Sequence, residues 1–187
     1  MVKIILASGS PRRQQFLKDM HLDFEIRIKE IDEIYPDHLQ STEITDYLAM
    51  LKAAAFDGTL LDNELLITSD TLVWLDKKAL GKPKDYKDAF EMLQQLSEKT
   101  HEVITSVCFS TNASKHVISD TTKVTFSALT SENIDFYLTH YKPFDKAGAY
   151  GIQDWIGLVG ISKIEGSYTN VVGLPTEKVF DYLQKLK

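Results

Sequence analysis

The sequence predicts an α/β fold with a mixed twisted sheet flanked by helices, and three observations support this prediction. Short apolar runs of strand length, such as residues 2–7 and 64–75, alternate along the chain with segments in which apolar residues recur at helical spacing. Ser10-Pro11 is typical of the start of a helix. Two neighbouring strand-like segments within residues 102–128 indicate a mixed rather than a purely parallel sheet.

The first half of the chain predicts three strands and two helices. Residues 2–7 form a short apolar run before a Ser/Gly turn, and a helix with Pro11 at its first position follows. A second helix fits residues 43–56, because Asp57-Gly58 supplies a stop signal. A strand fits residues 64–75, and the turn at 76–78 leads to a shorter strand that ends near Leu80. The inward residues expected for the two helices are Phe16, Leu17 and Met20, and then Ile44, Leu48, Leu51 and Ala55.

The second half continues the alternation. Asp85 can cap a helix, the strands are expected at 102–110 and 115–128, and Ser131 begins another helix. A further strand is expected at 157–164, and Pro175-Thr176 starts the last helix. The inward residues expected for these three helices are Phe90, Leu93 and Leu96, then Ile134, Tyr137, Leu138 and Tyr141, and finally Val179, Phe180, Leu183 and Leu186.

Length, charge and cysteine content narrow the class of protein. The 187 residues suit a single domain, which can have its sheet split into two lobes. The formal net charge of −6 argues against a basic surface that coats nucleic acid, so any anionic ligand needs locally clustered basic residues. One cysteine, Cys108, excludes an internal disulfide and fits a reducing compartment. Without a signal peptide or a long apolar stretch, the sequence predicts a cytoplasmic protein with no membrane partner.

A first candidate site is the turn Ser8-Gly9-Ser10 with the helix that follows it. The N-terminus of a helix attracts anions, and Arg12 and Arg13 add bidentate phosphate donors in its first turn. Arginines at this end oppose the helix dipole, so helix stability does not explain them. The alternative is a surface cap with solvated arginines; the coincidence of three features that favour anions makes phosphate binding the better interpretation.

The second candidate is Asp70, a carboxylate between two apolar runs of one strand. A charge buried there needs a metal or a cationic partner, which favours a functional carboxylate. The alternative is a strand that is broken at a bulge, which Ser69 and Thr71 would suit. Cys108, in an apolar strand, is interpreted as a core residue, and His101 as a solvated or core-edge histidine.

Other candidate residues are ordinary when they are taken alone. Lys52 borders the apolar stripe of its helix, where a lysine usually extends to solvent. Glu33 lies in an acidic loop, and Lys82 in an exposed turn. Gln153 follows a run of small residues and offers both donors and an acceptor to a base edge. By composition, residues 144–153 and 166–175 are loops.

Taken together, these segments resemble the Maf family of nucleoside triphosphate pyrophosphatases over nearly the whole chain, as a single domain spanning residues 1–187. The order and spacing of the matching segments make the resemblance specific. The segments are Leu6 to Arg13, the acidic loop with Glu33, Lys52-Ala53, Ser69-Asp70-Thr71, Gly81-Lys82-Pro83, His101 with Val103, Lys146 to Gln153, and Gly166 to Pro175.

The resemblance implies two lobes with a central cleft, a divalent metal, Mg²⁺ or Mn²⁺, and hydrolysis of a nucleotide between its α- and β-phosphates. It implies that Asp70 is the general base and that Glu33 and Asp70 hold the metal. The same resemblance assigns the triphosphate to Ser8, Arg13, Lys52 and Lys82. It also implies a homodimer. The chemistry agrees, because phosphoryl transfer depends mostly on positioning and charge neutralisation.

Substrate choice by resemblance involves Arg12, Thr71 and Gln153, at positions that distinguish the subgroups of the family. The segment that ends at Gln153 resembles the branch that acts on dTTP and UTP, with modified pyrimidine nucleotides as further plausible substrates. Three residues depart from the family pattern: Ser69 before Asp70, Ser106 in place of a usual glycine, and Asp154 in place of a usual glycine. The alternative function is a nucleotide-binding regulator of cell division without significant turnover.

Overall fold

The computed structural model describes residues 2–186, and these divide into two compact units. Unit 1 comprises residues 2–70, 105–120 and 173–186, and unit 2 comprises 71–104 and 121–172. The chain therefore passes between the units several times rather than forming two consecutive domains. The two units agree with the expected division into lobes, while the cleft and the single-domain organisation stay predictions.

Seven strands in the described residues form one sheet, in the order β2-β1-β3-β5-β6-β7, and β4 pairs with β3. The sheet is mixed, as predicted, because β1 pairs in parallel with β2 and β3, whereas β4 and β7 pair antiparallel with β3 and β6. The strands are β1 (Lys3–Leu6), β2 (Phe24–Ile26), β3 (Glu64–Leu75), β4 (Lys78–Leu80), β5 (Thr100–Ser110), β6 (Lys115–Phe126) and β7 (Ile161–Glu165).

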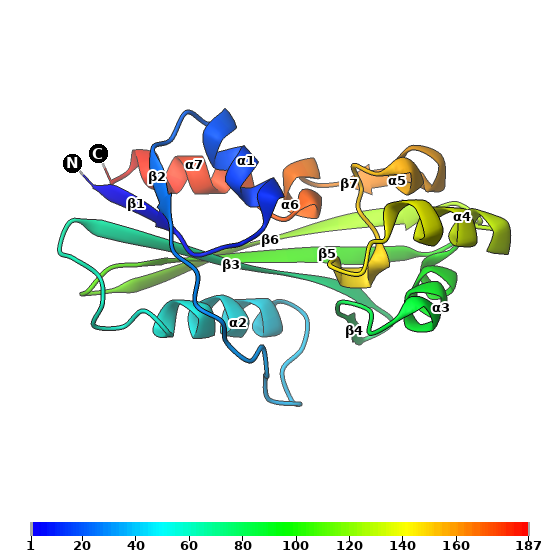
Figure 1. Cartoon of the computed structure of the whole chain (residues 1–187), viewed down its shortest axis with the longest axis horizontal. Coiled ribbons are helices and arrows are strands. Elements are labelled where there is room, and N and C mark those ends of the chain that lie inside the picture. The colour runs from blue at the N-terminus through cyan, green and yellow to red at the C-terminus, as the bar shows by residue number, and fades with distance from the viewer. Residues whose placement is uncertain (1, 187) are drawn as a thin grey trace. The chain divides into compact units, whose positions relative to one another are not determined.

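In unit 1, alternate residues of the central strands face two separate cores, as the two-residue period of a strand requires. Leu65 and Ile67 of β3 contact helices α1 (Pro11–Asp19) and α7 (Thr176–Gln184), whereas Leu66 between them contacts α2 (Thr42–Ala54). Figure 1 shows α1 and α7 on one face of this part of the sheet and α2 on the other. The even-numbered residues of β3 up to Asp70 therefore lie on the face that α2 covers.

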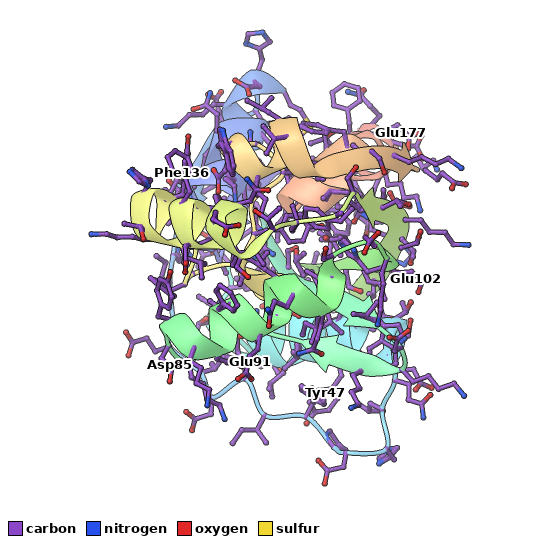
Figure 2. All side chains as sticks on the ribbon, turned by 90° about the vertical axis from the view of Figure 1, so that its right-hand side faces the viewer. Tyr47, Asp85, Glu91, Glu102, Phe136 and Glu177 are labelled. Carbon is purple, nitrogen blue, oxygen red and sulfur yellow. The ribbon has the colours of Figure 1, made fainter. Side chains whose placement is uncertain are left out.

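In unit 2, β3 continues into a tight hairpin with β4, in which Val73 pairs with Leu80. Asp76 and Lys77 form the two-residue turn with positive φ angles of 49° and 63°, the combination that a hairpin of this length prefers. Helix α3 (Tyr86–Leu96) follows, with Asp85 as its cap: the Asp85 carboxylate accepts the Asp88 N–H at 2.9 Å, as predicted. Figure 2 shows Asp85 at the start of α3.

The remaining helices of unit 2 precede and follow Gln153 in the chain. Helix α4 (Ser131–Tyr141) packs against α3 and is closed at its start by a capping box between Thr130 and Asn133. A short 3-10 helix η1 (Ala147–Ala149) and helices α5 (Trp155–Gly160) and α6 (Tyr168–Val172) complete the unit. Phe136 on the outward side of α4 is visible in Figure 2.

The structure corrects several predictions about elements. The expected strand at 157–164 is helix α5 as far as Gly160, because Asp154 starts a helical turn in which the Gly157 N–H donates to the Asp154 carbonyl at 3.0 Å. Strand β7 begins only at Ile161. The loops expected at 144–153 and 166–175 contain η1 and α6.

Side-chain burial corrects a few further details. Tyr141, Phe180 and Leu186 are exposed. In α2, Ala49 and Ala53 are buried, whereas Leu51 and, just after the helix, Ala55 are only half-buried. His101 is not solvated but 2% exposed, whereas Cys108 is buried as predicted. No helix within residues 2–186 combines the length and apolar character needed to cross a membrane.

Candidate active site

The ammonium group of Lys52 lies between two carboxylates in unit 1. Its Nζ is 2.6 Å from Asp70 Oδ1 and 3.0 Å from Glu33 Oε1. Asp70 is 7% exposed and β3 continues through it, so the interpretation of a broken strand is wrong. The sequence predicts that a buried Asp70 needs a metal or a cationic partner, and the structure gives it a cationic partner, Lys52.

Two buried hydrogen bonds fix the position of the helix that carries Lys52. The Thr68 hydroxyl donates to the Ala49 carbonyl at 2.7 Å, and the Thr45 and Ser106 hydroxyls lie 2.7 Å apart. Thr45, Ala49 and Lys52 are spaced to lie on one helix face, and Thr68 and Asp70 share one face of β3. The same helix face therefore makes both ties to the sheet and directs Lys52 to Asp70.

Arg13 connects the start of α1 to the backbone beside Asp70. Its Nη1 donates to the Ser69 carbonyl at 2.9 Å, and its Nε donates to the Gly173 carbonyl at 2.8 Å. Burial lowers the pKa of Arg13, and the negative charge of Asp70 acts in the opposite direction. A guanidinium nevertheless stays charged in proteins, so Arg13 supplies a fixed positive charge here.

The turn before α1 is organised by Ser8 rather than by a side-chain cap. Ser8 is 8% exposed, and its hydroxyl accepts the Ser10 N–H at 3.3 Å and lies 3.5 Å from Arg13 Nη1. Ser10 occupies the predicted cap position and Pro11 the first helical position, but the Ser10 side chain makes no capping hydrogen bond. Ser8 and Arg13 thus meet at the N-terminus of α1, where the helix dipole favours an anion.

Ser69, next to Asp70, has its side chain on the opposite face of the strand. Its hydroxyl is buried and has no hydrogen-bond partner within residues 2–186, whereas its carbonyl accepts from Arg13 and lies 3.4 Å from Lys52 Nζ. The backbone of Ser69, rather than its side chain, therefore connects the two basic residues.

The donor set of unit 1 fits a hard divalent ion. Glu33 and Asp70 already converge on one cation, the ammonium of Lys52, and both offer carboxylate oxygens of the kind that Mg²⁺ and Mn²⁺ prefer. The described part of the chain contains no group of three or more His, Cys, Asp or Glu side chains arranged as a metal site. Mg²⁺ commonly uses one or two carboxylates together with phosphates of the substrate, which this pair would suit.

Of the other candidate residues, one belongs to unit 1 and three to unit 2. Arg12 is half-buried on α1, next to Arg13. Thr71 follows Asp70 on β3 but belongs to unit 2, as do the exposed Lys82 and Gln153. The structure thus groups Ser8, Arg13, Glu33, Lys52 and Asp70 in unit 1, and the assembly of Thr71, Lys82 and Gln153 with them stays a prediction.

Within unit 2, the segments that carry these residues are tied together through Gly148. The Gly148 N–H donates to the carbonyl of Gly81 at 3.0 Å, beside Lys82. Gly148 has a φ of +67°, and an added Cβ would lie 2.9 Å from a methyl group of Val73 on β3. Only glycine tolerates both the backbone conformation and this close approach.

Sequence reasoning missed the roles of two buried groups in unit 2, the unit that carries Gln153. His101 Nε2 lies 2.7 Å from the Tyr150 hydroxyl, and burial lowers the pKa of His101 to about 4. The hydroxyl of Tyr137, expected only as an apolar contact of its helix, hydrogen-bonds to residues on either side of Gln153. A tyrosine at helical spacing carries no local signal for such a role, because its partners lie more than ten residues away in the chain.

Comparisons with known proteins give the family of the chain. A family model described as Maf-like protein matches residues 3–186. A protein from Flavobacterium psychrophilum named dTTP/UTP pyrophosphatase is 71% identical over 97% of this chain and 93% of its own. A protein of the same name from Flavobacterium johnsoniae is 62% identical over 98% of this chain and 95% of its own.

Among solved structures, the Ham1 protein of Staphylococcus aureus matches with a TM-score of 0.55 and 15% identity over 99% of this chain and 100% of its own. At that identity the likeness shows the fold alone, an α/β architecture of the Ham1 type. The match of the family model over nearly every residue, together with relatives of such high identity, establishes that the chain belongs to the Maf family.

Proposed function

We propose that this protein hydrolyses dTTP and UTP to the nucleoside monophosphate and pyrophosphate. The observation that carries the proposal is the ammonium of Lys52 held between the Asp70 and Glu33 carboxylates at 2.6 and 3.0 Å. Such a cluster combines a buried base with cationic charge, which phosphoryl transfer needs. The relatives named dTTP/UTP pyrophosphatase support the choice of nucleotide.

In this proposal Asp70 is the general base. It takes a proton from water while the water oxygen adds to phosphorus and the bond between the α- and β-phosphates breaks, with pyrophosphate as the leaving group. Arg13, Lys52 and Lys82 offset the charge of the triphosphate, and Ser8 donates a hydrogen bond to it. Before ligands bind, Lys52 holds Asp70 in place, since its Nζ donates to Asp70 Oδ1.

A divalent ion belongs to the same proposal. Glu33 and Asp70 are the residues that would hold Mg²⁺ or Mn²⁺, and the bound ion would supply charge neutralisation for the phosphates. The fit of the two carboxylates to one cation supports this assignment.

Base selection is proposed to depend on Arg12, Thr71 and Gln153. The amide of Gln153 offers a donor and an acceptor to a pyrimidine edge, and its side chain is exposed for such contacts. Modified pyrimidine nucleotides fit the same chemistry, which would make the protein a housecleaning enzyme of the nucleotide pool. We expect it to act in the cytoplasm as a homodimer, without nucleic acid as a partner.

The test is pyrophosphate release with Mg²⁺ or Mn²⁺ from dTTP, UTP, CTP, 7-methyl-GTP and ITP, together with the variant Asp70→Asn. We expect turnover of dTTP and UTP to exceed that of the others, and Asp70→Asn to lose at least about a hundredfold in kcat while still binding nucleotide. Asp120→Asn is the matched control. Asp120 also forms an ion pair with a lysine, since Lys178 Nζ lies 2.8 Å from its Oδ1, but it is none of the candidate site residues.

The outcomes separate the alternatives. Preference for 7-methyl-GTP would keep the mechanism and refute the assignment of the base. Unchanged turnover in Asp70→Asn would remove Asp70 from the mechanism. Nucleotide binding without turnover of any substrate would favour the regulator of cell division.

A further inference from the structure

The side chain of Gln153 is exposed, so the backbone around it has to hold it in place. Gln153 lies in a four-residue turn from Gly151 to Asp154 that is closed by the Asp154 N–H, which donates to the Gly151 carbonyl at 3.0 Å. An amide can match a thymine edge or, turned over, a cytosine edge. Discrimination between these bases therefore depends on how firmly this turn holds Gln153.

One buried hydroxyl ties both ends of this turn to α4. Tyr137 is fully buried, and its hydroxyl accepts the Gly151 N–H at 3.0 Å and donates to Asp154 Oδ2 at 2.7 Å. Because a tyrosine hydroxyl has one proton to donate, the proton here goes to the carboxylate and a lone pair takes the N–H. Gln153 is thus bracketed by the two partners of Tyr137.

The Asp154 carboxylate also packs directly on Gly151. A Cβ built on Gly151 would lie 2.5 Å from Asp154 Oδ2, so a larger residue at that position would displace the Asp154 carboxylate. Asp154 does not use its side chain to cap α5. Its carboxylate is instead committed to Tyr137, and burial together with this hydrogen bond raises the pKa of the Tyr137 hydroxyl, which keeps the proton available for donation.

We propose that Tyr137 and Asp154 are positioning residues for substrate selection, which lock the turn that presents Gln153. The inference rests on the proposed function, in which Gln153 contacts the base. Neither residue touches the phosphates in this proposal, so the chemical step is expected to be spared.

The experiment measures kcat and KM for dTTP and dCTP in the native protein and in Tyr137→Phe, Asp154→Ala and Asp154→Asn. We expect Asp154→Ala, which removes one hydrogen bond of the Tyr137 hydroxyl, to raise KM for dTTP by about tenfold, and Tyr137→Phe, which removes both, to raise it by at least as much, with kcat within about twofold. Selectivity for dTTP over dCTP should fall in parallel. Asp154→Asn keeps an acceptor oxygen for Tyr137 and should restore native values.

The matched control is Tyr86→Phe. The Tyr86 hydroxyl donates to Asp135 Oδ1 at 2.6 Å, the same kind of bond in the same unit, but it is exposed and does not contact the turn of Gln153. Thermal unfolding of each variant verifies folding, and binding of dTMP and dCMP by calorimetry gives a second measure of selectivity that needs no turnover.

Native KM and selectivity in both Tyr137→Phe and Asp154→Ala would overturn the inference, as would a loss confined to kcat. If Tyr137→Phe alone unfolds, Asp154→Ala decides. Failure of the proposed function is a distinct result, because the native protein would then release no pyrophosphate from dTTP.

Discussion

Acidification from pH 7 to pH 5 is expected to destabilise the protein through His101. The imidazole is 2% exposed in unit 2, stacked on Phe126 with ring centroids 5.6 Å apart and hydrogen-bonded through Nε2 to Tyr150. Its Nδ1 has no hydrogen-bond partner within residues 2–186. Protonation would therefore bury a charge and a second N–H donor without an acceptor, which is why burial lowers the pKa to about 4.

The sign and size of the effect follow from linkage. The pKa of a histidine is about 6.5 in the unfolded chain, so between pH 6.5 and about 4 the unfolded state binds more protons than the folded state. The stability that neutral His101 contributes is complete above pH 6.5 and is lost as the pH falls toward 4. At about 1.4 kcal/mol per pH unit, acidification from pH 6.5 to 5 costs about 2 kcal/mol.

The assay is urea unfolding of the native protein, His101→Gln and His140→Gln at pH 7, 6 and 5. His101→Gln removes the titrating group, so its free energy of unfolding should fall by about 2 kcal/mol less than that of the native protein over this range. His140, exposed on α4, is the matched control and should leave the native pH dependence unchanged. The comparison uses the difference between pH values, so a general loss of stability does not affect it. Equal pH dependence in all three proteins would refute the reasoning.

Three further predictions follow from single contacts. Gly148→Ala should lower the free energy of unfolding, measured in urea, by about 2 kcal/mol, and Gly58→Ala by only about 1 kcal/mol. Both glycines have a positive φ, but an added Cβ meets a neighbouring atom only at Gly148. Equal losses in the two variants would contradict the importance of this contact. Arg27→Gln should lower the urea midpoint at pH 7 and weaken its dependence on pH below 4.5. Arg27 is the first of the groups that, with the Leu61 N–H and Lys3, lower the pKa of Glu64 to about 2, so the stability from this carboxylate is present above pH 4.5 and lost toward pH 2. An unaltered pH profile would contradict this. Lys52→Gln should tighten the binding of Mn²⁺ in the absence of nucleotide, measured by electron paramagnetic resonance. The reason is that the Lys52 ammonium competes with the metal ion for the Glu33 and Asp70 carboxylates. Equal or weaker binding would argue against a metal ion at these carboxylates.

Local patterns in the sequence predict much of the fold because they record which face of each element is buried. The bounds of β3 agree with the prediction, since its apolar runs end at turn residues on both sides. The prediction of a strand at 157–164 is wrong for its first half, because the four small and apolar residues at 157–160 suit either a strand or a helix. The turn that starts at Asp154 decides the outcome, and it depends on Tyr137, far away in the chain.

For the candidate site too, local sequence patterns predict burial but not the contacts between distant segments. A carboxylate in an apolar strand predicts a cation beside it, and the sequence correctly requires one for Asp70. The identity of that cation depends on how α2 packs on β3, through Thr68 and the Ala49 carbonyl, and no local pattern encodes that contact. Lys52 was therefore selected only by resemblance to the family, and physical reasoning alone favoured a solvated lysine.

Charge balance connects the acidic composition of the chain to the metal in the proposed function. In unit 1, Arg13 and Lys52 offset Glu33 and Asp70, so the cluster is close to neutral before a ligand arrives. A nucleoside triphosphate carries a charge of about −4 near neutral pH, which Lys52, held by two carboxylates, and Arg13, held by backbone carbonyls, do not balance. With a net charge of −6, the protein as a whole supplies no positive background either. A divalent ion bound by the two carboxylates would both replace the ammonium between them and release Lys52 for the phosphates, which is why substrate and metal are expected to bind more tightly together than separately.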